Sequence, residues 1–368
     1  MARGGLFACV CGFLLLGLTG PVLAGSEPPP LQGQASILRV GDTRIVAQLT
    51  GSSSRNDTSA RWDVRGTDLG HTFRHRDRLY MVFGDTFGAG GLGRENWRSN
   101  VMALIADAEP RHGLPFETMI TGPDGAAKEL IFSRKIDGIE KTVIPTNGIA
   151  LGGRMYLHYM SVRQWQEPGH WQVGHSGLAY SDDEGQSWRT PADAVWPEDS
   201  GFEQVAFARD GGFVHSFGIP EGRYGGVRLR RAAPERILVP AAYEYWNGAD
   251  WVADASAAAV IVPAPVGELS VAWSSPHKRW LMLYLEPQRR AIVLRTAPQL
   301  TGPWGHEQVV VTADEYPGLY GPYIVAGSEI DADLYYTMSL WGPYNVFLMH
   351  TTLQPAAPET KVAERGQG

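Results

Sequence analysis

Two aspartates, Asp68 and Asp85, stand where a short β-hairpin would bring them together. Asp68 comes just before the apolar stretch 69–73, and Asp85 comes just after the stretch 79–84, with turn-forming residues at 74–78 between them. If the turn is centred in that segment, the two strands pair with Asp68 opposite Asp85. Side chains that face each other across antiparallel strands have Cβ atoms ~4.5–5.5 Å apart. The spacing therefore predicts two neighbouring carboxyl groups.

Two carboxyl groups this close destabilise a sheet when both are ionised. Each raises the pKa of the other, so that one holds a proton while its neighbour stays ionised. Glycoside hydrolysis needs this division, because one carboxylic acid protonates the leaving oxygen and one carboxylate acts as base or nucleophile. The alternative is structural, with Asp85 ending a strand and Asp68 capping a loop. A one-residue register slip at Gly70 or Gly84 would remove the apposition.

The elements that must position these aspartates are short strands. The apolar stretches are rich in Val, Ile, Tyr, Phe and Trp and are bounded by Gly, Asp, Asn and Pro, which is typical of β-structure. A unit made of a turn, an aromatic strand and a second apolar strand recurs along the chain. The turn and first strand of the units occupy 75–87, 151–162, 210–220, 277–287 and 330–341. The second strands follow at 100–106, 177–181, 225–231, 291–297 and 345–351.

These repeated units predict an all-β, five-bladed β-propeller, in which radial sheets surround a channel. We place the propeller at 37–354 and expect the early strands at 37–40 and 44–49 to complete the last blade. The segment 181–188 fits the Ser-x-Asp-x-Gly-x-Ser/Thr-Trp turn of sialidase-like propellers, and we interpret it as structural. A β-sandwich is the alternative fold, because the units are unevenly spaced.

A set of short motifs resembles one family of glycoside hydrolases. The motifs are Asp68-Leu69-Gly70, Phe83-Gly84-Asp85-Thr86-Phe87-Gly88, Trp97-Arg98-Ser99-Asn100, Pro145-Thr146-Asn147-Gly148, Tyr156-Leu157-His158-Tyr159-Met160, Gly267-Glu268-Leu269-Ser270 and Trp341-Gly342-Pro343-Tyr344-Asn345. Together they resemble the bacterial endo-D-arabinanases, a family once catalogued as a domain of unknown function and common in mycobacteria and other actinobacteria. The resemblance implies a five-bladed propeller, hydrolysis of α-linked D-arabinofuranose polymers, and an acid/base pair at Asp68 and Asp85.

Two arguments about the stereochemical outcome disagree. The resemblance implies inversion, for which the two carboxyl groups lie ~6.5–9.5 Å apart to admit a water molecule. Direct apposition across two strands fits instead the ~5–5.5 Å separation of retaining enzymes. Both outcomes stand at this point.

Further candidate substrate-binding residues lie near the predicted inner strand ends. Arg and Asn side chains suit sugar hydroxyls, and aromatic rings suit sugar faces. The candidates are Trp97, Arg98, Asn100, Asn147, His158, Glu268, Tyr320, Tyr344 and Asn345. For each of them a structural role within a blade is the alternative. Glu268 is a third carboxylate, which could replace Asp68 as the acid or could pair with an arginine.

The N-terminal segment predicts export. Arg3 precedes an apolar stretch at 6–18, and Val22-Leu23-Ala24 follows, which is the pattern of a cleaved signal peptide at 1–24. The stretch is shorter than the ~20 residues of a membrane-spanning helix, so we expect removal and no remaining membrane anchor. Residues 25–36 are expected to be a flexible lead-in and 355–368 a disordered tail. The protein would then be periplasmic or secreted, and a monomer.

Composition argues against several function classes. With a net charge of −7, nucleic acid is not an expected partner. Both cysteines lie within 1–24 and no His-Glu-x-x-His motif occurs, so we expect neither a metal nor another cofactor. The Gly-x-Ser-x-Gly elbow of serine hydrolases is also missing. The expected partner is a polysaccharide substrate. The alternatives are a non-catalytic glycan-binding propeller and a glycosidase acting on another furanoside or on sialic acid.

Overall fold

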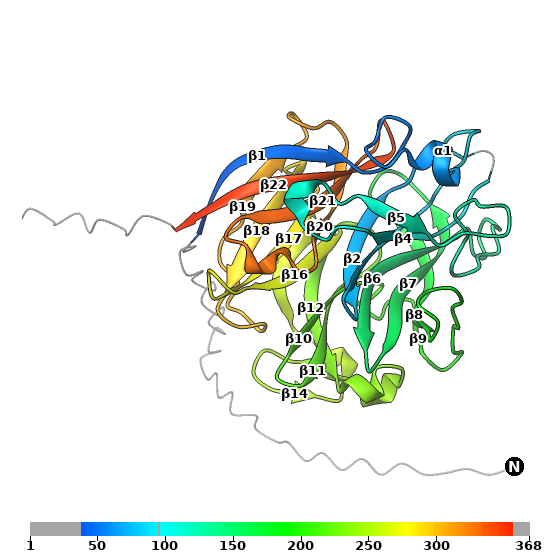
Figure 1. Cartoon of the computed structure of the whole chain (residues 1–368). Helices are drawn as coiled ribbons and strands as arrows, with labels where there is room; N and C mark the ends of the chain where they lie inside the picture. Colours follow the sequence, from blue (N-terminus) through cyan, green and yellow to red (C-terminus); the bar gives the residue numbers. More distant parts are fainter. Residues whose placement is uncertain (1–37, 94–95, 356–368) are drawn as a thin grey trace, which may run out of the picture. The chain divides into compact units, whose positions relative to one another are not determined.

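The computed structural model describes residues 38–93 and 96–355, which form five antiparallel β-sheets arranged as a five-bladed β-propeller (Figure 1). The predicted signal peptide and lead-in lie outside the described residues, as does the predicted tail apart from Pro355, the last residue of the last strand. The described chain has one short α-helix, α1 (Thr58–Trp62), capped by the side chain of Asp57. Its 3-10 helices are Pro110–His112, Pro234–Arg236, Pro240–Ala242, Ala255–Ala257 and Ser328–Ile330. None of the described helices is long and apolar enough to cross a membrane.

Each blade is an antiparallel meander whose first strand packs against the first strands of the neighbouring blades. The first blade consists of β2 (Leu69–His75), β3 (Arg78–Phe83), β4 (Val101–Ile105) and β5 (Phe116–Met119). The second consists of β6 (Thr142–Leu151), β7 (Arg154–Trp165), β8 (Trp171–Ser181) and β9 (Val195–Pro197). The fourth consists of β16 (Leu269–Ser274), β17 (Arg279–Glu286), β18 (Ala291–Ala297) and β19 (Gln308–Thr312). The repeat predicted from the sequence corresponds to the second and third strands of the blades and is confirmed.

The third blade is more elaborate. Its strands are β10 (Gln204–Asp210), β11 (Phe213–Ile219), β12 (Gly225–Ala232), β13 (Glu244–Trp246), β14 (Trp251–Val252) and β15 (Val260–Val266). Two strands share one edge of β12, because β13 pairs with its end at Arg230 and Arg231, while β15 pairs with its beginning. The insertion that contains β13 and β14 brings two additional tryptophans, Trp246 and Trp251, to this blade.

The first strand of the described chain closes the ring. The last blade consists of β20 (Leu319–Ile324), β21 (Leu334–Leu340), β22 (Asn345–Pro355) and β1 (Leu38–Gln48). β1 pairs with β22 from Leu38 opposite Pro355 to Gln48 opposite Phe347, and the two strands lie side by side in Figure 1. The expected closure is confirmed, although one bulged strand replaces the two predicted ones. Backbone hydrogen bonds therefore join the two ends of the propeller without a disulfide.

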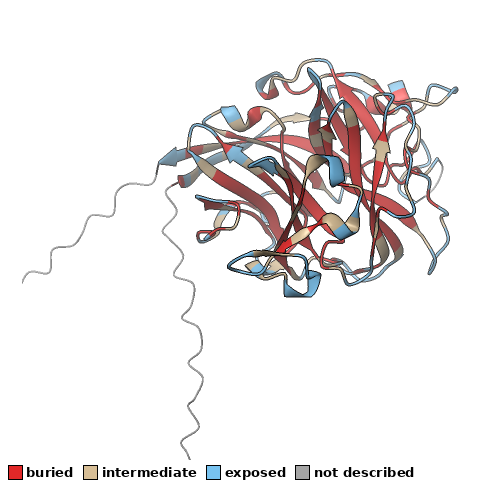
Figure 2. Cartoon of the chain, turned by 90° about the horizontal axis from the view of Figure 1, so that it is seen from below, coloured by how far each residue is buried: buried red, intermediate tan, exposed pale blue. Residues whose placement is uncertain are grey.

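Successive side chains of a strand point to opposite faces of its blade, and these side chains form the core between neighbouring blades. In β3, Leu79, Met81 and Phe83 pack against the last blade, while Tyr80 and Val82 pack against the second blade. Successive side chains of a strand point to opposite faces, so a strand between two blades must be apolar at every position. Figure 2 shows the inner strands as mostly buried, whereas the loops and outer strands such as β1 carry the exposed residues.

The turn after β8 has the structural role predicted for it. Asp183 accepts hydrogen bonds from the backbone N–H of Ser187 at 2.8 Å and from the hydroxyl of Ser181 at 2.8 Å. The indole of Trp188 donates to the carbonyl of Gly185 at 3.1 Å and packs partly buried against the core between the first two blades. The polar groups of this motif are therefore used within the turn itself.

Candidate active site

The first strands of the blades begin at one end of the channel, and the predicted carboxylates gather there. Asp68 comes directly before β2, and Glu268 comes directly before β16. Thr142 is the first residue of β6, and Tyr320 is the second residue of β20. Asp85 follows β3, which is antiparallel to β2 and returns to the same end. Four blades thus contribute side chains to one site, which we call the carboxyl end of the channel.

The two aspartates are close, but they are not directly opposite. The predicted register holds from His75 opposite Arg78 to His71 opposite Val82. At Gly70, which has a φ of 88°, the register slips by one residue, so that the N–H of Gly84 donates to the carbonyl of Asp68 at 3.2 Å. The predicted apposition is therefore wrong, because the bulge at Gly70 places Gly84 and not Asp85 opposite Asp68.

Asp68 lies in surroundings that favour its protonated form. Burial, followed by the charge of Asp85, raises the pKa of Asp68 to about 7, while hydrogen bonds from Tyr320 and Tyr344 oppose the rise. The Tyr320 hydroxyl donates to Oδ2 at 2.9 Å, whereas the buried Oδ1 has no hydrogen-bond partner among the described residues. Oδ1 packs against Gly84, where an added Cβ would lie only 2.5 Å away. A charge on Oδ1 is costly because no described residue lies in hydrogen-bonding geometry to this atom.

Asp85 is buried, but its carboxyl group accepts more hydrogen bonds than that of Asp68. Its Oδ1 accepts hydrogen bonds from the indole of Trp97 at 2.8 Å and from the hydroxyl of Thr142 at 2.5 Å. Burial raises the pKa of Asp85 to about 6, and the two hydrogen bonds and the charge of Lys135 limit the rise. The two carboxyl groups therefore differ in the direction that an acid/base pair needs, with Asp85 the more readily ionised.

Glu268 pairs with an arginine, which was one of the two readings of this residue. Arg223 donates to both carboxylate oxygens of Glu268, with its Nη2 at 2.6 Å from Oε1. The guanidinium also lies over the ring of Tyr320, 5.2 Å from its centroid, and the Tyr320 hydroxyl bonds Asp68. The ion pair of Arg223 and Glu268 therefore packs against Tyr320, which in turn orients Asp68.

Aromatic rings extend from the carboxyl groups towards the surface. Phe87 stacks on Trp97 with ring centroids 6.0 Å apart and touches Tyr344 at 5.8 Å. Tyr344 meets Trp341 edge-on at 5.6 Å, and Trp341 is 61% exposed. Because faces of sugar rings pack on such surfaces, these residues form a suitable platform beside the two aspartates.

Three other candidates have structural contacts. The guanidinium of Arg98 is buried and donates to the carbonyls of Asp63 and Ala127. The amide of Asn100 donates to two carbonyls and accepts from two backbone N–H groups, which uses its bonding capacity. Asn345 accepts from Thr50 at 2.9 Å and so ties the start of the chain to the last blade. These residues shape the loops around the site.

Two candidates lie elsewhere in the propeller. His158 is buried between the second and third blades, where its Nδ1 is 2.7 Å from the hydroxyl of Thr146. Asn147 lines a channel cavity of about 510 Å³ together with residues from the further parts of all five innermost strands. The two residues pair across β6 and β7, well along the strands from the carboxyl end.

Sequence reasoning missed two residues that contact the site. Thr142 occupies the start of the second blade's first strand, the position that corresponds to Asp68 in the first blade, so aligning the blades could have found it. Arg223 lies in the connection between β11 and β12, and no local pattern indicated its pairing with Glu268.

Residues 38–93 and 96–355 contain no group of three or more His, Cys, Asp or Glu residues arranged to hold a metal ion. His71 and His75 have the four-residue spacing that brings helical ligands together, but both lie on the strand β2. Four residues of extended strand separate their backbones by ~13 Å. Burial lowers the pKa of His71 to about 3, so this side chain is neutral in the protein.

The chain is similar in sequence to fungal proteins and in fold to several solved structures. Notoamide biosynthesis cluster protein J of Aspergillus sp. (strain MF297-2) is 30% identical over 308 residues, which cover 77% of this chain and 82% of that protein. A solved structure from Bacteroides ovatus ATCC 8483 has a TM-score of 0.57 at 14% identity, covering 80% of this chain and 88% of the other. An exo-β-1,3-galactanase from Phanerochaete chrysosporium has a TM-score of 0.52 at 8% identity, covering 86% and 65%. At these identities the structural likeness shows a shared fold.

The family match covers the whole site. A family model described as "Domain of unknown function (DUF4185)" matches residues 53–350. This segment includes Asp68 and Asp85 and extends from before α1 into β22. The chain therefore belongs to the DUF4185 family.

Proposed function

We propose that the protein is a glycoside hydrolase that cleaves internal α-D-arabinofuranosyl linkages of D-arabinan-type polysaccharides, with Asp68 and Asp85 as its acid/base pair. The observation that carries the proposal is a pair of carboxyl groups with raised pKa values: Asp68, half-buried with its Oδ1 fully buried, at about 7, and Asp85, buried, at about 6. Burying these groups costs free energy that a purely structural role does not recover. Their pKa values suit proton transfer near neutral pH.

The different surroundings assign the two roles. Asp68 is the general acid, because its pKa is the higher of the two and its Oδ1 lacks a donor within the described structure. Asp85 is the base, because Trp97 and Thr142 stabilise its ionised form. Asp68 gives its proton to the glycosidic oxygen as the bond to the anomeric carbon breaks. Asp85 takes a proton from the water molecule whose oxygen bonds to that carbon.

The register slip at Gly70 bears on the stereochemistry. Direct apposition was the argument for a short carboxyl separation, and the bulge removes that apposition. We therefore propose that a water molecule fits between the two groups and that the anomeric configuration is inverted. Proton NMR of the first product released from an arabino-oligosaccharide distinguishes the two outcomes, because a retained α-anomer contradicts the proposal.

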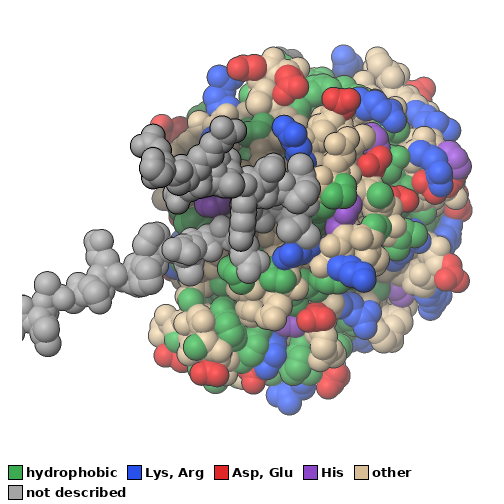
Figure 3. Space-filling view, turned by 90° about the vertical axis from the view of Figure 1, so that its left-hand side faces the viewer, with side chains coloured by type: hydrophobic (Ala, Val, Ile, Leu, Met, Phe, Trp, Pro, Cys, Tyr) green, Lys and Arg blue, Asp and Glu red, His purple; other side chains and the backbone are tan. Residues whose placement is uncertain are grey.

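The substrate class rests on the resemblance to endo-D-arabinanases and on the surroundings of the carboxyl end. Trp97, Tyr344 and Trp341 supply apolar faces beside Asp68 and Asp85. Figure 3 shows another face of the molecule, on which acidic and basic side chains are interspersed with hydrophobic and uncharged ones. The fungal relatives are named for a biosynthetic cluster and not for a glycan, so they support the family and not the substrate. Export, expected from residues 1–24, would bring the enzyme to an extracellular polysaccharide.

The test uses D-arabinan-bearing arabinogalactan, with L-arabinan as the control polymer. The protein and its Asp85→Asn variant are incubated with each polymer, and released oligosaccharides are separated by chromatography. We expect oligomers from the D-arabinan alone and a loss of at least ~10³-fold in the variant. Asp314→Asn, at a carboxylate that is 91% exposed, is the matched control and should leave the rate unchanged.

Each alternative function has its own outcome. Release from another furanoside or from a sialoside, abolished by Asp85→Asn, would keep the mechanism and change the substrate. Binding of a glycan without any release, little affected by Asp85→Asn, would indicate a glycan-binding propeller and overturn the proposal.

A further inference from the structure

A second cavity opens at the end of the propeller opposite to the carboxyl end. It is lined by the ends of β10 and β16, the starts of β11 and β17, and the loop 298–301 after β18. Because β10 and β16 begin at the carboxyl end, their last residues lie at the other end of the ring. The cavity has a volume of about 670 Å³, which is within the ~300–1,000 Å³ range of small-molecule sites.

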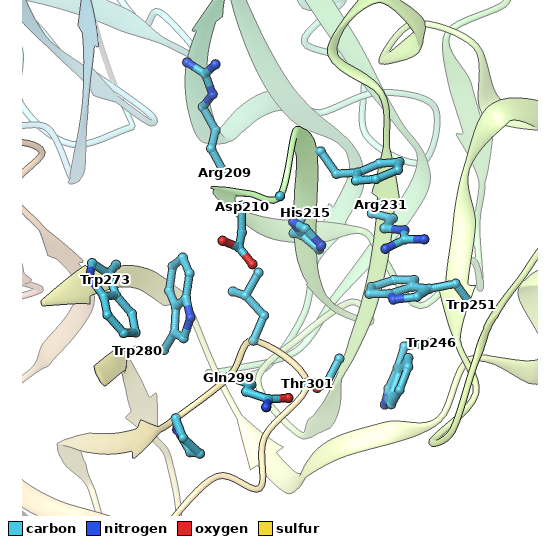
Figure 4. Close-up of a pocket in the computed structure, with 14 residues that line it drawn as sticks. Arg209, Asp210, His215, Arg231, Trp246, Trp251, Trp273, Trp280, Gln299 and Thr301 are labelled. Atoms are coloured by element: carbon cyan, nitrogen blue, oxygen red, sulfur yellow. The ribbon is translucent and has the colours of Figure 1, made fainter. Parts of the chain in front are cut away.

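Four tryptophans line this cavity, in two pairs. Trp246 and Trp251 have ring centroids 5.4 Å apart, and so do Trp273 and Trp280. Figure 4 shows one pair on each side of the cavity, with Asp210, Gln299 and Thr301 between them. Trp273 is 36% exposed and Trp246 and Trp251 are only partly buried, so the rings present apolar surface to solvent. Large aromatic surfaces left exposed in this way mark sites of interaction.

The polar groups between the tryptophans are free to bind a ligand. The side chains of Asp210 and Gln299 are exposed and make no hydrogen bond or ion pair with any described residue. His215 is 4% exposed, and its buried Nδ1 has no partner within the described chain. These groups supply acceptors and donors of the kind that hydroxyl groups need.

Charge in the cavity is balanced. Arg231 forms an ion pair with Glu244 at 2.8 Å, and its guanidinium is stacked on Phe213 and Trp251, 4.1 and 4.2 Å from their ring centroids. This arginine therefore fixes the orientation of Trp251 and is not available to an anion. The other charged residues of the lining are Arg209 and Asp210, one of each sign, so the lining does not favour a strongly charged ligand.

We propose that this tryptophan pocket, defined by Trp246, Trp251, Trp273 and Trp280, is a second binding site for neutral saccharides. A sugar ring has an apolar C–H face, which stacks on indole, and an edge of hydroxyl groups, which bond Asp210 and Gln299. The site lies across the propeller from Asp68 and Asp85, and it takes no part in bond cleavage. It holds a polysaccharide on the protein independently of the carboxyl end.

The experiment measures binding at the tryptophan pocket and at the carboxyl end separately. Protein labelled with 5-fluorotryptophan and carrying Asp85→Asn is titrated with galacto-, xylo- and D-arabino-oligosaccharides, and 19F resonances are assigned by single substitutions. We expect the resonances of Trp251 and Trp273 to shift saturably with at least one of the three. Binding should weaken by about tenfold or more in Trp251→Ala and in Asp210→Ala. Asp210 is exposed at the end of β10, so its variant tests the site even if the tryptophan variant folds poorly.

Trp165→Ala is the matched control, because Trp165 is 39% exposed but belongs to the second blade, and it should leave the shifts unchanged. Shifts confined to Trp97 and Trp341, or no shifts with any of the three saccharides, would overturn the second site. Saccharide binding in the tryptophan pocket without hydrolysis of D-arabinan would overturn the proposed activity and leave the second site standing.

Discussion

The polar groups at the carboxyl end and in the tryptophan pocket have opposite surroundings. At the carboxyl end, Asp68 and Asp85 are held by hydrogen bonds from neighbouring blades, and burial raises their pKa values. In the tryptophan pocket, Asp210 and Gln299 are exposed and make no side-chain bonds to the described chain. Carboxyl groups that are buried and held can be tuned for proton transfer, whereas exposed and unpaired groups can only bind. Under the two proposals, the fold separates bond cleavage from retention of the ligand.

Removing the proton donor should have the largest effect. In Asp68→Asn the glycosidic oxygen must leave without a proton, so we expect the rate on D-arabinan to fall by ~10²–10⁴-fold. A 4-nitrophenyl arabino-oligosaccharide has a leaving group that needs no proton, so its cleavage should fall much less. Steady-state rates on both substrates check this expectation.

The variant of the proposed base, Asp85→Asn, is expected to behave differently from Asp68→Asn. Asp85→Asn should lose activity on both substrates, because activation of water is needed whatever the leaving group is. Equal losses in Asp68→Asn on the polymer and on the aryl glycoside would contradict the assignment of Asp68 as the acid.

Filling the space beside Asp68 should have the next largest effect. A Cβ at residue 84 would lie 2.5 Å from Oδ1 of Asp68 and 3.0 Å from a methyl group of Leu69, so Gly84→Ala must displace the carboxyl group. We expect about a tenfold or larger fall in kcat and a destabilisation of ~1–3 kcal/mol. Rates and thermal unfolding measure the two effects.

Gly342→Ala is the control for this change, because an added Cβ there meets nothing within 4 Å. It should leave both quantities near their original values. Unchanged activity in Gly84→Ala would show that the position of Asp68 does not depend on the tight packing seen at Oδ1.

The blades were predictable because their signal is local. In β17, Trp280, Met282 and Tyr284 pack towards the third blade, and Leu281, Leu283 and Leu285 pack towards the last blade. Such strands read as continuous apolar segments between turns, and the turns recur once per blade. The second and third strands of the blades, and the closing of the ring by the early strand, follow from this pattern.

The carboxyl end was predictable only in part. Asp68, Asp85, Trp97, Tyr320, Tyr344 and Glu268 were expected there and do lie together. The slip at Gly70 was not fixed by the pattern, because a bulge changes the register by one residue without changing the sequence of apolar positions. Arg223 and Thr142 reach the site from other blades, and such contacts leave no mark in local spacing. For the same reason the tryptophan pocket, with residues of the third and fourth blades, was not expected.

The raised pKa of Asp68 also predicts an effect on stability. The folded protein binds this proton more tightly than the unfolded chain does, because the pKa rises from 3.8 to about 7. The carboxyl group therefore stabilises the fold fully below about pH 4, and that contribution is lost as the pH rises through 7. Asn stays neutral, so Asp68→Asn should be more stable than the original protein by roughly 1–3 kcal/mol at about pH 8.

Chemical denaturation at several pH values measures this difference, which should shrink towards zero at about pH 4. The exposed carboxylate of Asp314 provides the comparison, since Asp314→Asn should change stability little at either pH. A variant at Asp68 that is less stable than the original protein at about pH 8 would mean that the carboxylate is better solvated than the structure indicates.

The smallest expected effect comes from removing the hydrogen bond that orients Asp68. The Tyr320 hydroxyl donates to Oδ2 and lowers the pKa of Asp68, so Tyr320→Phe should raise that pKa. If Asp68 is the acid, it must be protonated to act, and the alkaline limb of the pH–rate profile then moves to higher pH while the acid limb, set by Asp85, stays in place. Tyr336→Phe, at a buried hydroxyl in the same blade but away from the carboxyl groups, should move neither limb. A shift of the acid limb to higher pH would instead show that Asp68 is the base. A base must be ionised to act, so a rise in its pKa reduces the rate on the acid side of the profile.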